Sequence, residues 1–210
     1  MNVATPIDNF RALLESAAGH APTERETTAR RTQLAAFAAL SAVLMAALWG
    51  LAAGSMSPLL AVANLYKVPA IVLLSGLSAI PAGLLTAYLA DSGARATDLL
   101  LSYATSVFAG TLVMAVLSPL VAIYYHTSAW AGPLLGLGSA VLGVTVGAWV
   151  FVRVSLRSIV PGTRRRGLLL AVGVFTAVKL AMMLQLIAVL SPILPQADTF
   201  DGGIDALVTR

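Results

Sequence analysis

The sequence contains no cysteine, only two histidines and few charged residues. The absence of cysteine excludes disulfides and thiolate metal sites, and His20 and His126 offer little material for metal or haem ligation. Charged residues make up 10% of the chain and hydrophobic residues 59%, which is far from the mixture that a water-facing globular surface requires. We therefore expect an integral membrane protein that has no metal and no other cofactor.

The chain contains long apolar runs with few charged residues in them. Five of them reach the roughly 20 residues that a helix needs to cross a hydrocarbon core of about 30 Å. They do not alternate between apolar and polar residues as barrel strands do, so helices are predicted. The expected fold class is all-α, a polytopic bundle of five transmembrane helices. The predicted spans are 33–54, 67–90, 99–125, 129–154 and 167–194.

The basic residues lie beside alternate connections between these spans. Arginines precede the first span, follow the second and flank the connection after the fourth, whereas SMSPLLAVANLY and HTS contain none. The positive-inside rule then predicts a cytoplasmic N-terminus and an outside C-terminus. We expect a cytoplasmic N-terminal region at 1–32, a transmembrane domain at 33–194 and an extracytoplasmic acidic tail at 195–210. The sequence pI of 9.9 is better explained by topology and anionic lipid headgroups than by nucleic-acid binding.

Both terminal regions contain amphipathic patterns. In the segment 6–16, Ile7, Phe10, Leu13 and Leu14 share one helical face. This predicts a short helix that either lies on the cytoplasmic membrane surface or packs against a partner. The acidic tail lacks the ligand spacing of an EF-hand, so a segment that folds back onto the outer surface is predicted there instead of a calcium site.

The string AVLSP occurs twice, at 115–119 and 188–192, near the outer ends of two predicted spans. Proline removes a backbone donor and crowds the preceding turn, and a nearby serine hydroxyl can satisfy backbone groups that this frees. The repeat is therefore interpreted as a device that ends parallel helices. Chance is the alternative in a chain so rich in alanine, valine and leucine.

The fourth span contains a stripe of small residues at helical spacing. Such stripes let helix backbones approach closely, which matters because lipid provides no hydrophobic drive for helix association. Packing within the monomer is the preferred interpretation, and a dimer face is the alternative. The predicted helix-packing residues are Gly132, Gly136, Ala140, Gly143 and Gly147.

Two lysines lie within or beside apolar runs. Lys67 is close to the outer end of its span, so its stem is expected to carry the ammonium to the headgroups. Lys179 lies about 18 Å into the last span at 1.5 Å per residue, where a charged lysine costs at least about 2.5 kcal/mol unless it reaches water or a partner. It marks either a hydrated, anion-accepting site or a structural lysine that is neutral or paired. The candidate intramembrane site comprises Lys179, Thr176, Gln185, Ser102, Thr105, Ser106 and Asp98, with Tyr103 as a further local partner.

The motifs of familiar enzymes are missing. The chain has no Walker loop, no HExxH motif and no paired intramembrane carboxylates, and GLGSA at 136–140 has no histidine on another predicted span to serve it. No enzymatic activity is therefore expected. His126 is expected to anchor an interfacial aromatic cluster with Tyr124, Tyr125 and Trp130.

With its segment NLYKVPAIVLL, which contains Lys67-Val68-Pro69, and its five close-packed spans, the chain resembles bacterial membrane proteins of the broad Yip family, the Ypt-interacting membrane proteins. The likeness covers roughly residues 33–194. It implies a connection with membrane trafficking and small-GTPase association, in which the eukaryotic relatives are implicated. The short N-terminal region departs from the longer cytoplasmic domains of those relatives and puts the GTPase interaction in doubt. No functional residues transfer from it.

These observations predict a non-catalytic integral membrane protein that acts as a scaffold, a membrane-organising factor or an accessory subunit. Its expected partners are membrane lipids and either another protein or further copies of itself. The alternative is a small channel or transporter for an anion or amphiphile that uses Lys179. The high alanine content and the preference for arginine over lysine suggest a bacterial source, and hence the cytoplasmic (inner) membrane.

Overall fold

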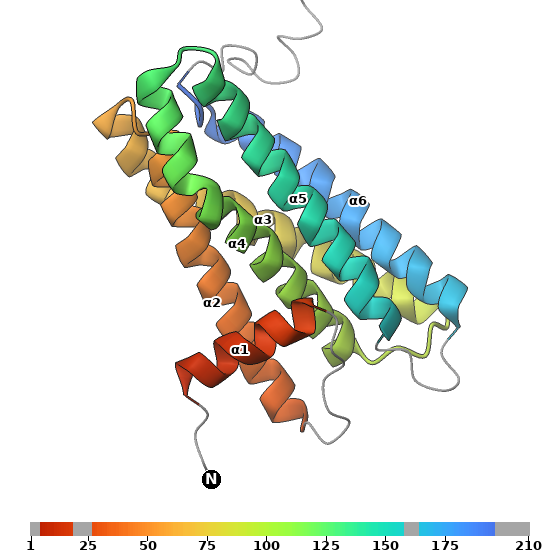
Figure 1. The fold of residues 1–210 in the computed structure, drawn as a ribbon. Coiled ribbons are helices and arrows are strands. Elements are labelled where there is room, and N and C mark those ends of the chain that lie inside the picture. The colour runs from red at the N-terminus through yellow and green to blue at the C-terminus, as the bar shows by residue number, and fades with distance from the viewer. Residues whose placement is uncertain (1–4, 19–26, 158–163, 196–210) are drawn as a thin grey trace, which may run out of the picture.

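The computed structural model describes residues 5–18, 27–157 and 164–195. Within these ranges the chain forms six helices and no strand, which confirms the predicted all-α class. Five long helices run side by side, and a short one crosses the bundle near one end (Figure 1). In chain order they are α1 (Pro6–Ala17), α2 (Thr28–Ala53), α3 (Pro58–Leu89), α4 (Ala96–Thr127), α5 (Ala131–Arg157) and α6 (Arg165–Leu190).

The helices α2 to α6 are long and apolar enough to cross a membrane. They contain 26 to 32 residues each. At 1.5 Å per residue this is about 39 to 48 Å of helix, against about 30 Å of hydrocarbon. The five predicted spans are thus confirmed, and the chain is a multi-pass membrane protein.

Four of the helices, α2, α3, α4 and α6, begin before the apolar runs that predicted them, and the difference is largest for α2 and α3. α2 begins at Thr28, because the side chain of Thr27 accepts a hydrogen bond from the N–H of Arg30 and caps the helix within a polar stretch. α3 begins at Pro58, where Ser57 is the N-cap and the fixed φ of proline suits the first turn. Hydropathy marks the hydrocarbon and not the helix end, so the predicted boundary between residues 32 and 33 falls inside α2.

The five spans pack in a fixed order around the bundle. α4 lies between α2 and α5, and α3 lies between α2 and α6. α5 and α6 have a smaller contact with each other, although they run next to one another (Figure 1). Because the number of spans is odd, α2 begins at one end of the bundle and α6 finishes at the other.

The short helix α1 crosses the bundle near the end where α2 begins. Thr5 caps it, and Asp8 accepts hydrogen bonds from the Thr5 N–H and hydroxyl, so the first turn carries a capping box. Leu13 is buried and Phe10 meets Phe108 of α4 edge-on, with ring centroids 5.4 Å apart. The helix predicted for 6–16 therefore packs on the chain's own bundle, while Ile7 stays 79% exposed.

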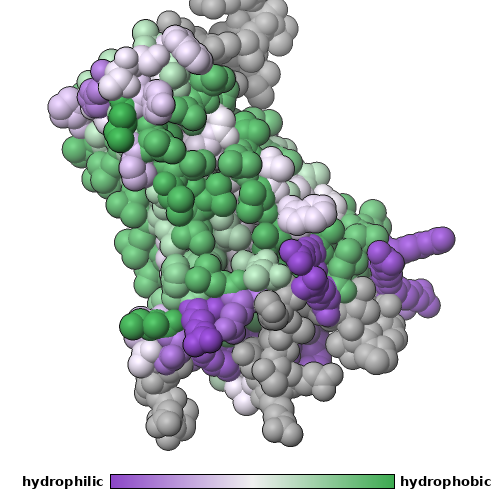
Figure 2. Space-filling view, in the orientation of Figure 1, coloured by the Kyte–Doolittle hydropathy of each residue, from purple (hydrophilic) through white to green (hydrophobic). Residues whose placement is uncertain are grey.

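Most of the described charged residues gather at this same end, as Figure 2 shows by its hydrophilic colour below a largely apolar bundle, whereas Lys67 and Lys179 lie elsewhere. We call this end the arginine-rich end. It receives the start of α2, the connection from α3 to α4, the end of α5 and the start of α6. Its described arginines are Arg11, Arg30, Arg31, Arg95, Arg153, Arg157, Arg164, Arg165 and Arg166.

The two AVLSP strings have different outcomes. At 188–192 the helix α6 ends at Leu190 with Ser191 as its C-cap, as the interpretation expects. At 115–119 the interpretation is wrong, because α4 continues through Pro119 as far as Thr127. There the Ser118 hydroxyl donates to the carbonyl of Met114 at 3.0 Å, whereas the carbonyl that loses its helical donor at Pro119 is that of Ala115. The acidic tail predicted for 195–210 lies, apart from residue 195, outside the described residues.

Candidate functional site

Lys179 extends into the bundle from the middle of α6. It lies 14 residues past Arg165, or about 21 Å along the helix. Its side chain is half-buried, and its Nζ lies 5.2 Å from the ring centroid of Tyr103 on α4. Side chains on a helix lean toward its N-terminus, so the lysine leans toward the arginine-rich end. This is a cation–π contact, which gives an ammonium some compensation without a carboxylate.

The ring beneath Lys179 belongs to a cluster of three aromatic residues. Tyr103 lies 4.4 Å from Phe175 of α6 and 5.7 Å from Phe151 of α5, measured between ring centroids. α3 makes room for two of these rings with glycine. A Cβ at Gly76 would collide with the Tyr103 hydroxyl, and a Cβ at Gly83 would collide with the ring of Phe175. Four spans therefore meet at this aromatic cluster.

Two of the residues predicted to surround Lys179 form hydrogen bonds within their own helices. On α6, the Thr176 hydroxyl donates to the carbonyl of Val172 at 2.8 Å. On α4, the Ser106 hydroxyl donates to the carbonyl of Tyr103 at 2.6 Å. These serine and threonine hydroxyls are satisfied locally, as is common in membrane helices.

The remaining predicted residues differ in burial and in their partners. Ser102 and Thr105 are buried on α4, and within the described ranges the Thr105 hydroxyl has no hydrogen-bond partner. Gln185 is exposed on the outside of α6. The carboxylate of Asp98, one proposed partner for Lys179, instead pairs with the guanidinium of Arg31 on α2, and both side chains are only 15% exposed. The structure therefore brings Tyr103 to Lys179, pairs Asp98 with another residue and leaves Gln185 on the outside of α6.

The glycines of the α5 stripe lie against α4. A Cβ at Gly143 would stand 2.8 Å from the carbonyl oxygen of Gly110, and one at Gly147 would stand 3.1 Å from the carbonyl oxygen of Ser106. Nearer the other end of the bundle, Gly132 and Gly136 accommodate the backbone and ring of Tyr125 on α4, and Ala140 is half-buried beside the packed core. This stripe packs within the monomer. Sequence reasoning missed Gly110, its counterpart on α4, because a single glycine in an apolar run is no pattern by itself.

Lys67 also has a partner inside the chain. Its ammonium donates to the carbonyl of Pro192 at 3.1 Å, and the buried Asn64 donates to the carbonyl of Ile193 at 2.8 Å. Both side chains belong to α3 and hold the segment that follows α6. The ammonium therefore has a backbone carbonyl as a partner within the chain, and its reach to the lipid headgroups stays a prediction. Asn64 was not singled out in the sequence, although an amide within an apolar run is the signal that could have found it.

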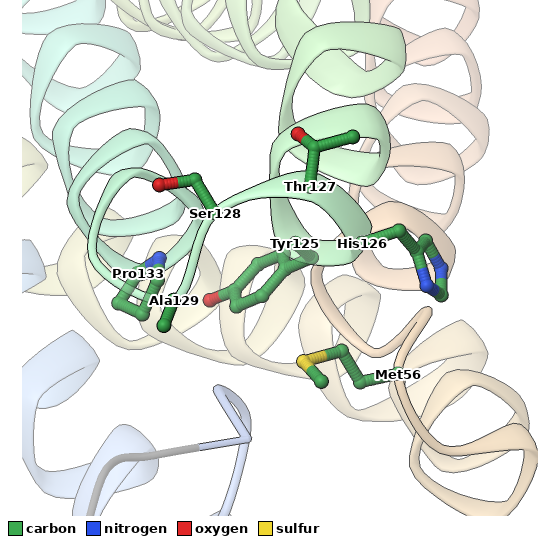
Figure 3. Close-up of a pocket in the computed structure, with 7 residues that line it drawn as sticks. All are labelled: Met56, Tyr125, His126, Thr127, Ser128, Ala129 and Pro133. Atoms are coloured by element: carbon green, nitrogen blue, oxygen red, sulfur yellow. The ribbon is translucent and has the colours of Figure 1, made fainter.

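A pocket of about 260 Å³ lies at the end opposite the arginine-rich end. Figure 3 shows Tyr125 pointing into it, with Met56 across from the ring and His126 to one side. Tyr125, predicted to be interfacial, is 4% exposed, while Trp130 is 73% exposed and suits that prediction better. The lining residues are Met56, Tyr125, His126, Thr127, Ser128, Ala129 and Pro133. In the part of the chain that the structure describes, no three histidine, cysteine or acidic side chains come close enough to hold a metal ion.

Comparisons of the chain with models of protein families, with curated proteins and with solved structures found no match.

Proposed function

We propose that this protein is a non-catalytic accessory subunit or scaffold of the membrane, and that the outward face of α6 docks on a transmembrane helix of a partner protein. α6 packs mainly against α3, and its most apolar stretch is the least buried of the five spans. Its outward face carries the small residues Gly173, Ala177 and Ala181 at intervals of four, all of them exposed. No atom lies within 4 Å of a Cβ added at Gly173.

Gln185 extends this line by one further turn. Its amide is exposed on a helix otherwise surrounded by apolar side chains. Hydrocarbon offers the amide no hydrogen-bond partner, whereas a neighbouring helix can provide one. Such an interhelical hydrogen bond stabilises helix association by about 0.6 to 2 kcal/mol. The observation that carries the proposal is this combination of an unoccupied small-residue line with an exposed amide at its end.

The same chain shows how such a line is used. On α5 the stripe of glycines brings the backbone against Gly110 of α4, so that interface is already filled within the monomer. No helix among the described residues packs against the small-residue line on α6. A helix of another chain could approach it as closely as α5 approaches α4.

The test compares two exposed glycines. Gly173→Leu blocks the proposed face, while Gly138→Leu adds the same side chain to α5, where a Cβ also meets nothing within 4 Å and the neighbouring turns already present leucine. Tagged variants are purified from native membranes in mild detergent, and co-purifying proteins are quantified by mass spectrometry. We expect Gly173→Leu to retain about ten-fold less partner than Gly138→Leu, and Gln185→Leu to weaken retention as well.

Equal thermal unfolding of both glycine variants establishes that α6 still folds. Equal retention of every co-purifying protein by the two variants contradicts the proposal. A tagged copy that recovers only an untagged copy of the same chain, in a manner dependent on Gly173, makes the partner a second copy.

We further propose that the arginine-rich end faces the cytoplasm of a bacterial inner membrane. The distribution of arginine supports the orientation, and the alanine-rich, lysine-poor composition supports the source. Since the chain has no cysteine, single-cysteine variants at Ala96 and Ala129 can report it. A membrane-impermeant maleimide should label Ala129→Cys in intact cells and Ala96→Cys only after lysis, and the reverse pattern would contradict the orientation. The likeness to Yip-family proteins fits a membrane-organising role and stays a hypothesis.

A further inference from the structure

The arginine-rich end carries far more positive than negative charge. Its described residues include nine arginines and four carboxylates. Each carboxylate already has a partner within the chain. Asp8 binds Thr5, Glu15 binds Arg11, Asp91 pairs with Arg164 and Asp98 pairs with Arg31.

Several guanidinium groups are therefore left without an acidic partner among the described residues. Arg30 is held by the side-chain oxygens of Asn9 and Gln33, which are neutral. The remaining groups include four exposed arginines from three different elements. They are Arg95, Arg153, Arg165 and Arg166.

Arg153 differs from the others in its depth. It lies on α5 one turn before Arg157, the last residue of the helix, and thus about 6 Å inside the helix end. Trp149 lies one further turn inward and is 67% exposed. An exposed indole followed by an exposed guanidinium toward the helix end is the order in which a span meets the interface and then the lipid phosphates. This order places the guanidinium of Arg153 at the level of the headgroups when the spans sit in a bilayer.

We propose that the arginine-rich end binds the headgroups of anionic phospholipids, and that Arg153 and Trp149 form the contact on the side of the bundle. A guanidinium can bind two oxygens of a phosphodiester with parallel hydrogen bonds. Zwitterionic lipids carry the same phosphate, but their own cation neutralises it. The excess of unpaired arginine therefore selects for net negative lipid. An arginine near such a surface strengthens binding to it by about five-fold.

Quenching of Trp149 by brominated lipid measures this enrichment directly. Of the three tryptophans, Trp49 is buried, and Trp130 lies in the connection between α4 and α5, at the opposite end. Trp130→Phe therefore leaves Trp149 as the indole that lipid reaches. The protein is reconstituted in phosphatidylcholine vesicles in which one fifth of the lipid is acyl-brominated, either as phosphatidylglycerol or as phosphatidylcholine.

We expect brominated phosphatidylglycerol to quench Trp149 more strongly, with an apparent local enrichment of about five-fold. Arg153→Gln should lower that enrichment, and Arg165→Gln with Arg166→Gln should lower it further. Arg11→Gln is the charge-matched control, because Arg11 already pairs with Glu15, and it should leave the enrichment unchanged.

Equal quenching by the two brominated lipids overturns the proposal. So does enrichment that survives all three glutamine substitutions, or that falls equally in the Arg11→Gln control. Loss of enrichment on adding inorganic phosphate at the concentration of the anionic lipid would show that the end binds a free anion, which also overturns the assignment to lipid. Unchanged thermal unfolding establishes that each variant is folded.

Discussion

The closest backbone approach described between α4 and α5 depends on Gly110, and replacing it with alanine tests the packing of the bundle. A Cβ at this position would lie 2.5 Å from the carbonyl oxygen of Gly143. Ordinary contact begins at about 3.4 Å, so the two helices must separate locally by about 0.9 Å. The obstructing atom belongs to the backbone, and no side-chain rotation can relieve the collision.

The expected cost follows from this displacement. Overpacking by one methyl group costs about 1 to 3 kcal/mol in a well-packed interior, and a gap of up to 1 Å forfeits a quarter to a half of the dispersion energy of the contacts it opens. The separation also affects the neighbouring contacts of Gly147 along the same interface. We therefore expect Gly110→Ala to lower the free energy of unfolding by about 2 to 3 kcal/mol.

Thermal unfolding in detergent micelles, followed by circular dichroism, measures this change. Gly138→Ala is the matched control, because it adds the same methyl group to an exposed position of α5 with nothing within 4 Å. The control should be unchanged or slightly more stable, since alanine favours the helix over glycine by up to about 1 kcal/mol. Equal stability of the two variants would refute the close backbone contact between α4 and α5.

Three further results are expected. Arg31→Met and Asp98→Asn should each destabilise the protein by about 1 to 2 kcal/mol, with a coupling of similar size in a double-mutant cycle of unfolding free energies, because their ion pair is mostly shielded from water. Hydrogen bonds from the capping threonine lower the pKa of Asp8 from its ordinary value of 3.8, so their stabilisation of α1 is present above that value and is lost as the pH falls through the lower folded-state pKa. Amide hydrogen exchange in α1, corrected for its intrinsic rate, should therefore rise only below about pH 4. Trp49→Phe should cost about 1 kcal/mol of unfolding free energy, because it removes the buried hydrogen bond of 2.8 Å to the Ser139 hydroxyl.

The number and type of the spans could be predicted because the hydrocarbon imposes one strong requirement. Every backbone polar group must be satisfied inside the membrane, so an apolar run of sufficient length is a helix. The helix ends follow a weaker and more local rule. Thr27 and Ser57 cap their helices at positions that precede the predicted spans. A hydropathy profile does not detect such capping residues, so it could not predict where these helices begin.

The two Ser-Pro pairs show that the same local sequence can adopt different structures in different tertiary surroundings. The Ser-Pro pairs at 118–119 and 191–192 have identical sequences for three residues before them, yet one lies inside a helix and the other ends it. At the second pair, Lys67 and Asn64 of α3 donate hydrogen bonds to the carbonyls of Pro192 and Ile193. These bonds stabilise a non-helical conformation of the segment that follows α6. The two Ser-Pro pairs thus differ in their partners on another helix, and the sequence of the string AVLSP carries no information about those partners.

For Lys179, the sequence predicts its depth in the membrane but not its partner. Its depth is a property of one helix and follows from counting residues along the last apolar run. Its partner depends on three helices, because the Tyr103 ring can lie beneath the ammonium only where Gly76 of α3 leaves space for the tyrosine hydroxyl. A carboxylate is the partner that sequence reasoning favours for a buried cation, yet all four described carboxylates are engaged at the arginine-rich end. An aromatic face costs less to bury than a second charge, since it needs no hydration of its own, and an interior built from apolar runs can supply it without adding an acidic residue to any span.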